Sequence, residues 1–332
     1  LNNKTILITG GTGSFGKKMV RKILKEFNPK KIIIYSRDEL KQHDLQRSLI
    51  AFKKKLRFFI GDIRDLPRLK KSFHNVDYVI HAAALKHVPV AEYNPFEAVK
   101  TNIIGTQNVI DASLDTNVKK VIALSTDKAS SPVNLYGATK LTADKLVIAA
   151  NNHKGSAITK FSVVRYGNVL GSRGSIVPHL LSLKKNDILT ITDKEMTRFS
   201  ITLNEGIDFV INCLHSMWGG EIFIPKIKSY RLLDLASAIS KNFKIKIIGI
   251  RPGEKIHEEM ISINDSQNTV ELKNSYIICP NSEFIGWNKN QYKKSFKGKF
   301  CKSDFSYSSS KNKFLTPSEI NKIISKNSKD FD

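Results

Sequence analysis

Two short segments of the sequence carry side chains whose types and spacing suit acid–base chemistry. Residues 125–128 read Ser-Thr-Asp-Lys, and residues 136–140 read Tyr-Gly-Ala-Thr-Lys. Together they offer a hydroxyl, a carboxylate, amines and a phenol, which can give and take protons in several steps on one small substrate. The apolar residues 121–124 predict a buried strand that ends at the first segment. We therefore expect these side chains at the carboxyl end of a parallel strand, where open α/β sheets bind ligands.

The second segment places Tyr136 and Lys140 at positions i and i+4, so they share one face of a predicted helix. A tyrosine with its ordinary pKa of about 10 is a poor base at neutral pH. An adjacent ammonium and an oxidised nicotinamide favour the phenolate. The pair can then remove a proton from a hydroxyl group while a hydride passes to the cofactor.

The elements that must position these groups alternate between strands and helices. Strands are predicted at residues 5–9, 31–35, 56–60, 76–80, 121–124 and 161–165. This alternation predicts an α/β protein with a Rossmann-type doubly wound parallel sheet and a smaller C-terminal mixed α/β substrate domain. We expect residues 1–170 to bind the cofactor, with a late strand near 221–225 returning to the same sheet. Residues 171–332 are expected to bind the substrate.

Composition narrows the class of protein. The chain has 332 residues, of which 41% are hydrophobic, and no apolar run approaches the roughly 20 residues that span a bilayer. A predicted strand begins almost at the N-terminus, so we expect no signal peptide. Three cysteines without metal-ligand spacing are expected to be reduced thiols in a cytoplasmic protein.

The net charge of +24 comes from lysines spread along the whole chain. This distribution favours a solvated basic surface over a nucleic-acid-binding face, and neither a nucleic acid nor a membrane is expected as a partner. A basic cleft also attracts phosphorylated ligands.

A glycine-rich loop follows the first predicted strand. Gly10, Gly13 and Gly16 allow a tight turn, a close approach of the backbone to a pyrophosphate, and close packing of the next helix. Ser14 and Phe15 lie at the start of that helix, whose N-terminus suits phosphate groups. The strand-turn-helix context makes this a predicted dinucleotide site.

The end of the second predicted strand distinguishes NADP from NAD. Ser36 and Arg37, with Lys41 further on, suit a 2′-phosphate better than a free ribose hydroxyl, although Asp38 lies beside them. We therefore expect NADP, tightly bound and recycled in each turnover. Further cofactor contacts are expected from Asp62, Ile63, Ala82, Ala83 and Lys86. For Asp62 the alternatives are a hydrogen bond to the adenine amine and a simple helix cap.

These residues together resemble the extended short-chain dehydrogenase/reductase superfamily. Within it, the sequence is most similar to inverting UDP-N-acetylglucosamine 4,6-dehydratases (5-epimerising) of the pseudaminic acid pathway. The resemblance spans nearly the whole chain, in segments 9–17, 35–40, 81–95, 124–140, 165–175, 196–199, 251–255 and 305–309.

The resemblance implies roles for the residues that end the fifth strand. Oxidation of the sugar at C4 would make the C5 proton acidic, and Lys128 would remove that proton. Asp127 would protonate the departing C6 hydroxyl. Thr126, which precedes Asp127, is also expected among the catalytic residues. The acid requires a raised pKa and the base a lowered one. Many related dehydratases carry Asp-Glu where this chain has Asp127 and Lys128. Tyr136 stands where membrane-anchored, retaining relatives have Met.

The same resemblance implies a substrate and its contacts. Arg198 and Arg251 would bind the diphosphate of UDP-N-acetylglucosamine, and Glu254 the uridine ribose. Asn168, Val169 and Lys86 are further expected contacts. A homo-oligomer, in this family a hexamer, is also implied. His257 and Glu258 complete no metal site, so no metal is expected.

Three other functions stay open at this point. They are an inverting dehydratase of a route to UDP-N-acetyl-fucosamine, a UDP-sugar 4-epimerase, and a non-catalytic dinucleotide-binding protein. Asp127 and Lys128 argue against the epimerase, and the intact pair of Tyr136 and Lys140 argues against the non-catalytic protein.

Overall fold

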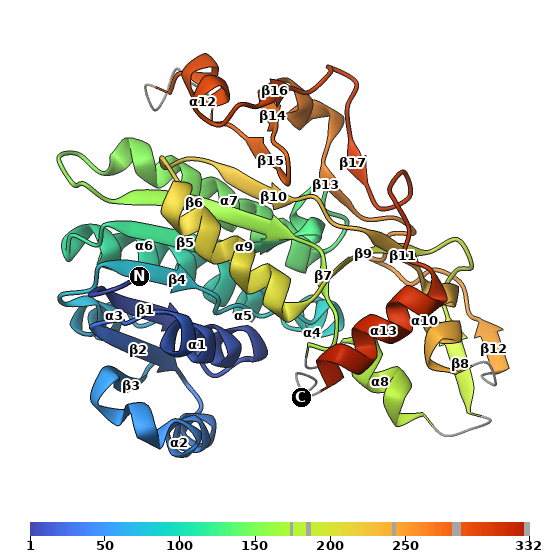
Figure 1. Ribbon diagram of the computed structural model, residues 1–332, viewed down its shortest axis with the longest axis horizontal. Helices are drawn as coiled ribbons and strands as arrows, with labels where there is room; N and C mark the ends of the chain where they lie inside the picture. Colours follow the sequence, from blue (N-terminus) through green and yellow to red (C-terminus); the bar gives the residue numbers. More distant parts are fainter. Residues whose placement is uncertain (173–174, 184–186, 241–243, 281–286, 329–332) are drawn as a thin grey trace.

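The computed structural model describes residues 1–172, 175–183, 187–240, 244–280 and 287–328. Within these residues a ten-stranded sheet forms the centre, with strand order β16-β14-β15-β10-β6-β5-β4-β1-β2-β3 (Figure 1). Residues 173–174, in one of the segments that carry the family resemblance, lie outside the described residues.

The six strands predicted for the N-terminal half all form, with ends that shift by a residue or two. They are β1 (Thr5–Thr9), β2 (Lys31–Ser36), β3 (Leu56–Ile60), β4 (Tyr78–His81), β5 (Lys120–Thr126) and β6 (Lys160–Tyr166). Each neighbouring pair is parallel. All carboxyl ends therefore meet at one edge, which is where the predicted chemistry lies.

Helices cover both faces of this sheet because its strands are buried on both sides. Alternate residues of β1 point to opposite faces, so Ile6 and Ile8 join one hydrophobic cluster and Leu7 the other. The first cluster packs under α1 (Ser14–Glu26), α2 (Glu39–Ser48) and α9 (Leu203–Ser216). The second packs under α3 (Leu66–Phe73), α6 (Gly105–Asp115) and α7 (Leu135–His153). The predicted doubly wound α/β fold is confirmed.

The helical segment between β4 and β5 is interrupted. Short helices α4 (Val88–Tyr93) and α5 (Pro95–Val99) lead into a π-helical turn, Lys100–Ile104, before α6. Asn102 in this turn bonds the backbone N and O of Leu85, at 2.8 and 2.9 Å. The irregular turn thus aims a buried amide at the loop after β4, which fits the frequent use of π-bulges near functional sites.

The sheet continues beyond residue 170. The late strand β10 (Ile222–Pro225) pairs in parallel with β6. The antiparallel strands β15 (Ser275–Ile278), β14 (Thr269–Glu271) and β16 (Lys299–Phe300) extend the same sheet outward. The division of the chain at residue 170 stays a prediction, because the central sheet itself draws strands from both sides of it.

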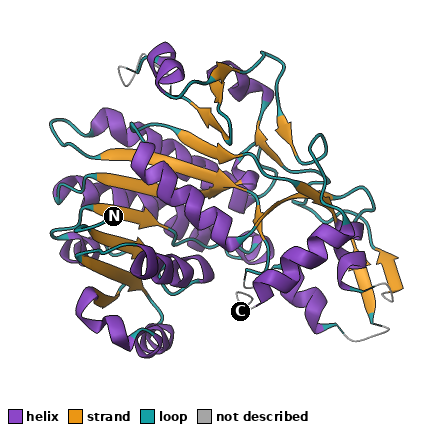
Figure 2. Cartoon of the chain, viewed as in Figure 1, coloured by secondary structure: helices purple, strands orange, loops and turns teal. Residues whose placement is uncertain are grey.

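The remaining elements build a mixed α/β region beside the carboxyl edge of the sheet (Figure 2). One three-stranded sheet consists of β7 (Asn168–Val169), β9 (Thr197–Ile201) and β11 (Ser229–Arg231). Two two-stranded sheets pair β8 (Ile188–Ile191) with β12 (Lys244–Ile247) and β13 (Glu259–Ile261) with β17 (Tyr307–Ser308). A third hydrophobic cluster joins α8 (Ile176–Ser182), α10 (Leu232–Ile239) and α13 (Pro317–Asn327). Helix α12 (Lys289–Ser295) lies beside β16 at the outer end of the sheet.

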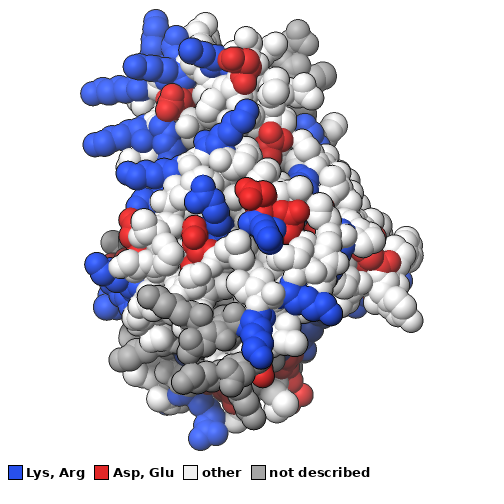
Figure 3. Space-filling model, turned by 90° about the vertical axis from the view of Figure 1, so that its right-hand side faces the viewer, with Lys and Arg blue, Asp and Glu red and all other residues white. Residues whose placement is uncertain are grey.

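Charges of both signs lie on the face of the molecule that Figure 3 shows. Figure 3 shows Lys and Arg side chains across one face, densest along its upper left edge, with acidic side chains among them. Some form pairs, such as Lys226 with Glu271 and Lys228 with Glu319, both at 2.7 Å. Among the described helices, none combines the length and apolar character that crossing a bilayer requires.

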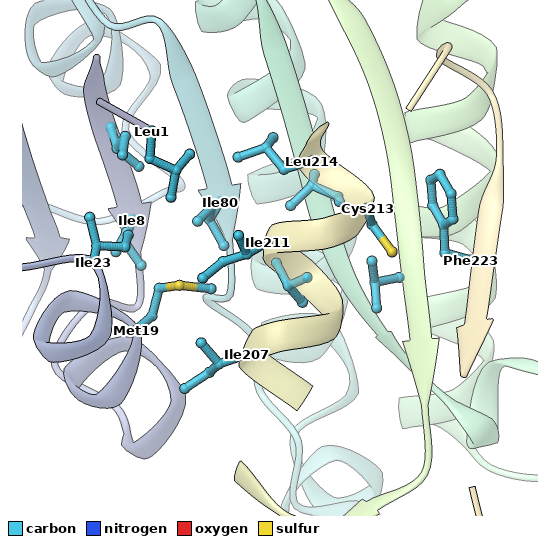
Figure 4. Packing of buried hydrophobic residues seen from close by; sticks show 14 of the residues in the cluster. Leu1, Ile8, Met19, Ile23, Ile80, Ile207, Ile211, Cys213, Leu214 and Phe223 are labelled. Atoms are coloured by element: carbon cyan, nitrogen blue, oxygen red, sulfur yellow. The ribbon is translucent and has the colours of Figure 1, made fainter. Parts of the chain in front are cut away.

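Replacing Ile207 by Ala tests the packing of α9 on the sheet. Ile207 is fully buried and lies beside Met19 of α1 (Figure 4). The truncation should lower the free energy of unfolding by about 2–5 kcal/mol, because it leaves a cavity in the core. Ile188→Ala is the matched control, since that side chain is 59% exposed; it should cost about 1 kcal/mol or less. Denaturant midpoints measure both, and equal shifts would contradict this packing.

Candidate active site

A cleft of about 1010 Å³ lies at the carboxyl ends of the parallel strands. Every residue predicted for cofactor binding or catalysis lines it, and so do Asn168 and Val169. Arg198, Arg251 and Glu254, predicted for the substrate, lie outside this lining. The structure therefore brings the two predicted chemical segments and the glycine-rich loop into one space.

The glycine-rich loop leaves no room for a side chain at Gly10 or Gly16. Gly10 has a positive φ of 65°, and a Cβ there would lie 2.9 Å from the backbone N of Ala83. A Cβ on Gly16 would lie 2.5 Å from Gly11 Cα. No side chain caps α1, whose N-cap is Gly13. A bare helix N-terminus beside a cradle of glycines is suited to a phosphate group.

The end of β2 presents a guanidinium to the cleft. Arg37 is half-exposed, with Nη1 3.6 Å from Asp62 Oδ2. Asp38 caps α2 by accepting from Lys41 N at 2.9 Å, and it also pairs with the Lys41 ammonium. The carboxylate of Asp38 is thus engaged by its own helix.

Asp62 is held by arginines. Its Oδ2 lies 2.7 Å from Arg64 Nη2, and its Oδ1 accepts from the Arg64 backbone N. Burial raises the pKa of Asp62, but the hydrogen bonds from Arg64 outweigh burial and lower it. Asp62 therefore closes a local turn rather than capping a helix, since the N-cap of α3 is Asp65, and this turn uses part of the carboxylate expected at the adenine.

A buried histidine fixes the loop that faces the glycines. His81 Nδ1 lies 2.7 Å from Thr9 Oγ1, and Nε2 lies 3.1 Å from Thr106 Oγ1. Thr9 Oγ1 also accepts from the backbone N of Ala82 and Ala83. Burial, helped by the charge of Lys140, lowers the pKa of His81 to about 3. The neutral ring therefore joins β1, β4 and α6 at the floor of the cleft.

Tyr136 and Lys140 lie on α7 with little exposure. The Lys140 ammonium donates to the Leu124 carbonyl at 2.8 Å, and burial lowers its pKa. Burial raises the pKa of Tyr136 to about 12, against the charge of Lys128 and a hydrogen bond with Thr126. The ammonium of Lys128 acts toward the phenolate, but burial outweighs its charge.

Asp127 is fully buried at the end of β5. Its Oδ1 accepts from Thr126 Oγ1 and from Lys128 Nζ, both at 3.0 Å, while Oδ2 has no partner among the described residues. Burial raises the pKa of Asp127 despite the opposing charge of Lys128. The direction agrees with the raised pKa expected for a proton donor.

The pKa of Lys128 differs in direction from the sequence-based expectation. Its Nζ lies 3.0 Å from Asp127 Oδ1 and 3.1 Å from Glu258 Oε1. Burial lowers the pKa of Lys128, but the two carboxylates outweigh burial and raise it above its ordinary value. The lowered pKa expected for a proton-abstracting base is therefore wrong for this arrangement, because two negative charges stabilise the ammonium.

Sequence reasoning missed Glu258 as part of this site. The side chain is buried, and its Oε1 lies 3.7 Å from Arg198 Nε. Burial raises the pKa of Glu258, but the charges of Lys128 and Arg198 lower it overall. The only available signal was its position directly after the segment 251–255, and nothing local links it to Lys128.

Of the residues predicted for the diphosphate and the ribose, Arg198 lies beside this cluster. Arg198 Nη1 donates to the carbonyls of Thr197 and Ile256. Arg251 lies 3.9 Å from Glu254, and Asn134 Nδ2 at the start of α7 donates to the Gly253 carbonyl at 2.8 Å. The loop of residues 251–254 thus contacts the helix that carries Tyr136.

A buried ion pair joins the strands and the helix of the site. Arg165 Nη2 lies 3.1 Å from Asp144 Oδ2, and the same carboxylate accepts from Ser125 Oγ at 2.8 Å. Arg165 Nη1 donates to the Met260 carbonyl of β13. β5, β6, α7 and β13 are thereby fixed together. No group of acidic, cysteine or histidine side chains in the described part of the chain is arranged to hold a metal ion.

The chain is similar to known proteins over most of its length. The family described as "Polysaccharide biosynthesis protein" matches residues 6–280. "UDP-N-acetylglucosamine 4,6-dehydratase (inverting)" of Campylobacter jejuni is 55% identical over 315 residues, covering 94% of each chain. "UDP-glucose 4-epimerase" of Rickettsia conorii is 41% identical over 285 residues, covering 83% of each.

Solved structures show the same fold. Pen from Bacillus thuringiensis has a TM-score of 0.88 at 41% identity, covering 98% of each chain. A dTDP-glucose 4,6-dehydratase from Streptomyces venezuelae, solved with NAD and TYD bound, has a TM-score of 0.67. At 22% identity, over 76% of this chain and 86% of that one, it supports the fold alone.

The lowered pKa of the buried His81 should make the free energy of unfolding depend on pH. Its pKa is 6.5 ordinarily and about 3 when folded, so the unfolded chain binds an extra proton between these values. This contribution to stability is complete above pH 6.5 and declines by about 1.4 kcal/mol for each unit below it. Between pH 7 and pH 5, wild type should lose about 2 kcal/mol more than His81→Gln, as measured by denaturant unfolding.

His74→Gln is the control for this measurement, because His74 is exposed. Its stability should follow the wild-type dependence on pH. Parallel curves for wild type and His81→Gln would contradict the buried, neutral state of His81.

Proposed function

The chain belongs to the polysaccharide biosynthesis protein family of extended short-chain dehydrogenases/reductases, and on that basis we propose that it is an inverting UDP-N-acetylglucosamine 4,6-dehydratase. The product would be UDP-2-acetamido-2,6-dideoxy-β-L-arabino-hexos-4-ulose. The observation that carries the proposal is the pair Asp127 and Lys128, which opens into the same cleft as Tyr136 and Lys140. Only a reaction that adds elimination to sugar oxidation needs both pairs.

The residues present fit a nicotinamide dinucleotide. The space that a Cβ would fill at Gly10 and Gly16, and the uncapped α1, suit a pyrophosphate. Such a cofactor, when bound there, would supply reversible hydride transfer with the substrate. Arg37 and Lys41 would contact a 2′-phosphate, which favours NADP, with Ser36 beside them. Further contacts would come from Asp62, Ile63, Ala82, Ala83 and Lys86.

Proton transfer at the sugar C4 hydroxyl falls to Tyr136. Because burial raises its pKa to about 12, the phenol needs support as it loses its proton. Thr126 and the charge of Lys128 act in that direction. Lys140 is anchored on the Leu124 carbonyl and adds a cation on the same helix.

Elimination falls to the neighbouring pair. Asp127 gives its proton to the C6 hydroxyl, which leaves as water, while Lys128 takes the C5 proton. The required neutral acid and neutral amine are the tautomer of the ion pair seen in the structure. One proton shift across the 3.0 Å contact produces both forms, so none has to enter from solvent. Protonation of C5 from the opposite face then inverts that carbon.

The 41% identity to a protein named UDP-glucose 4-epimerase raises a second candidate function. An epimerase oxidises and reduces one carbon, which needs Tyr136 and Lys140 but not a buried acid beside an amine. The buried Asp127 and Lys128 therefore favour the dehydratase. A dehydratase of a UDP-N-acetyl-fucosamine route would perform the same first reaction.

Assembly and setting follow from the family resemblance alone. We propose a cytoplasmic homo-oligomer, in this family a hexamer, that catalyses the first step of pseudaminic acid biosynthesis for glycosylation of surface structures such as flagellin. Arg198, Arg251, Glu254, Asn168 and Val169 would contact the UDP-sugar.

Incubation with UDP-N-acetylglucosamine in deuterated water, followed by NMR, tests the proposed function. We expect a 6-deoxy-4-keto product of L-arabino configuration with deuterium at C5. Lys128→Ala should abolish both C5 exchange and dehydration, because the abstracting amine is gone. A galacto product without a methyl group would identify a 4-epimerase instead.

The choice of cofactor is tested by titration with NADP and NAD. We expect tighter binding of NADP, and Arg37→Gln should weaken it by about tenfold to a hundredfold, the loss of one charged hydrogen bond. NAD binding should change little in the same variant, which makes NAD the internal control. Tighter binding of NAD to the wild-type protein would refute the preference for NADP.

A further inference from the structure

Hydrogen bonds hold the backbone of Glu258, which lies just before the short strand β13. Its backbone N–H donates to Ser309 Oγ at 2.9 Å, and the Ser309 N–H donates to the Glu258 carbonyl at 2.8 Å. Ser309 Oγ lies 2.7 Å from Thr197 Oγ1 of β9. The C-terminal segment 305–309 and β9 therefore fix the backbone from which this carboxylate projects.

The carboxylate of Glu258 meets two cations in a buried position. Oε1 lies 3.1 Å from Lys128 Nζ and 3.7 Å from Arg198 Nε, and the side chain is only 3% exposed. Oε2 is buried without a hydrogen-bond partner among the described residues. Buried charges persist when they are paired, and removal of one partner is costly. The position of Lys128 thus depends on Glu258 as well as on Asp127.

We propose that Glu258 is a positioning residue for the proposed dehydration: it fixes Lys128 Nζ beside Asp127 and stabilises the ammonium that Lys128 becomes on taking the C5 proton. The inference rests on the proposed function. Glu258 acts through Lys128 and is assigned no contact with the substrate.

The charge balance of the step gives the physical reason. The C5–H bond breaks, its electron pair forms the C5–C6 double bond, and the C6–O bond breaks as Asp127 supplies a proton to the leaving water. Lys128 gains a positive charge, while Asp127 gains a negative one. A carboxylate already fixed at 3.1 Å stabilises the new ammonium without rearrangement.

Other titratable and charged groups also face Lys128. The charge of Lys128 interacts electrostatically with Asp127, Tyr136 and Arg198. It also interacts with Tyr230 of β11 and with Lys255. Among these, Asp127 and Glu258 are the carboxylates within ion-pair distance of Nζ. Burial lowers the pKa of Lys128, and these two charges raise it.

Glu258→Gln removes the charge and keeps the shape. We expect the falling limb of kcat against pH, where the pair Asp127 and Lys128 loses its shared proton, to move to lower pH by about one unit or more, because a charge that raises the pKa of Lys128 is lost. The plateau of kcat should fall about tenfold or more, because the new ammonium is less stabilised. KM for UDP-N-acetylglucosamine should change little. A lower kcat at every pH with an unmoved limb would show a merely structural role and overturn the proposal.

Two further variants sharpen the test. Glu259→Gln removes the neighbouring carboxylate, which accepts from Ser131, and should keep the wild-type profile. Glu258→Asp keeps the charge on a shorter side chain, so the limb should keep its midpoint while kcat falls. If Glu258→Gln does not fold, Glu258→Asp decides, and an unchanged kcat there overturns the proposal.

Failure of the inference and failure of the proposed function have different signatures. Wild-type protein that neither exchanges C5 nor dehydrates UDP-N-acetylglucosamine refutes the function. Active wild-type protein whose profile coincides with that of Glu258→Gln refutes only the role of Glu258.

Discussion

The buried ion pair between Arg165 and Asp144 fixes the relative positions of the elements that form the cleft, β5, β6, α7 and β13. Asp144 lies on α7 with Tyr136 and Lys140, and it accepts a hydrogen bond from Ser125 at the end of β5. Arg165 reaches the Met260 carbonyl in β13, two residues beyond Glu258. One interaction therefore links the helix of the redox pair, the strand of the elimination pair and the segment that carries the missed carboxylate. Losing either partner would leave an uncompensated buried charge, so these parts keep one arrangement.

That arrangement sets the electrostatics of the cleft. Burial is the main cause that raises the pKa values of Asp127 and Tyr136 and lowers that of Lys140. Lys128 behaves differently, because it lies between two carboxylates whose charges outweigh burial. The resting site thus stores an ion pair whose tautomer is the form needed for elimination. A shift of one proton inside the cluster converts one into the other, which suits the proposed elimination because its acid and its base form without a proton from solvent.

Much of the fold followed from local patterns. The strands up to residue 166, the glycine-rich loop and the pairing of Tyr136 with Lys140 depend on periodicity and spacing within a few residues, so the sequence predicted them. The π-helical turn that carries Asn102 was missed, because its side chain hydrogen-bonds to the Leu85 backbone, a tertiary contact that no local pattern predicts. The sheet beyond β10 was also missed, since short antiparallel strands give weak periodic signals.

The sequence by itself determined the family, the dinucleotide loop and the residues that we propose as the acid, the amine and the phenol. These depend on residue types at fixed spacings, which chain order preserves. Only the tertiary structure decided the charge state of Lys128 and brought Glu258 to it. A pKa depends on charges within a few ångströms, and here one of those charges comes from a distant strand segment, anchored by Ser309 near the end of the chain.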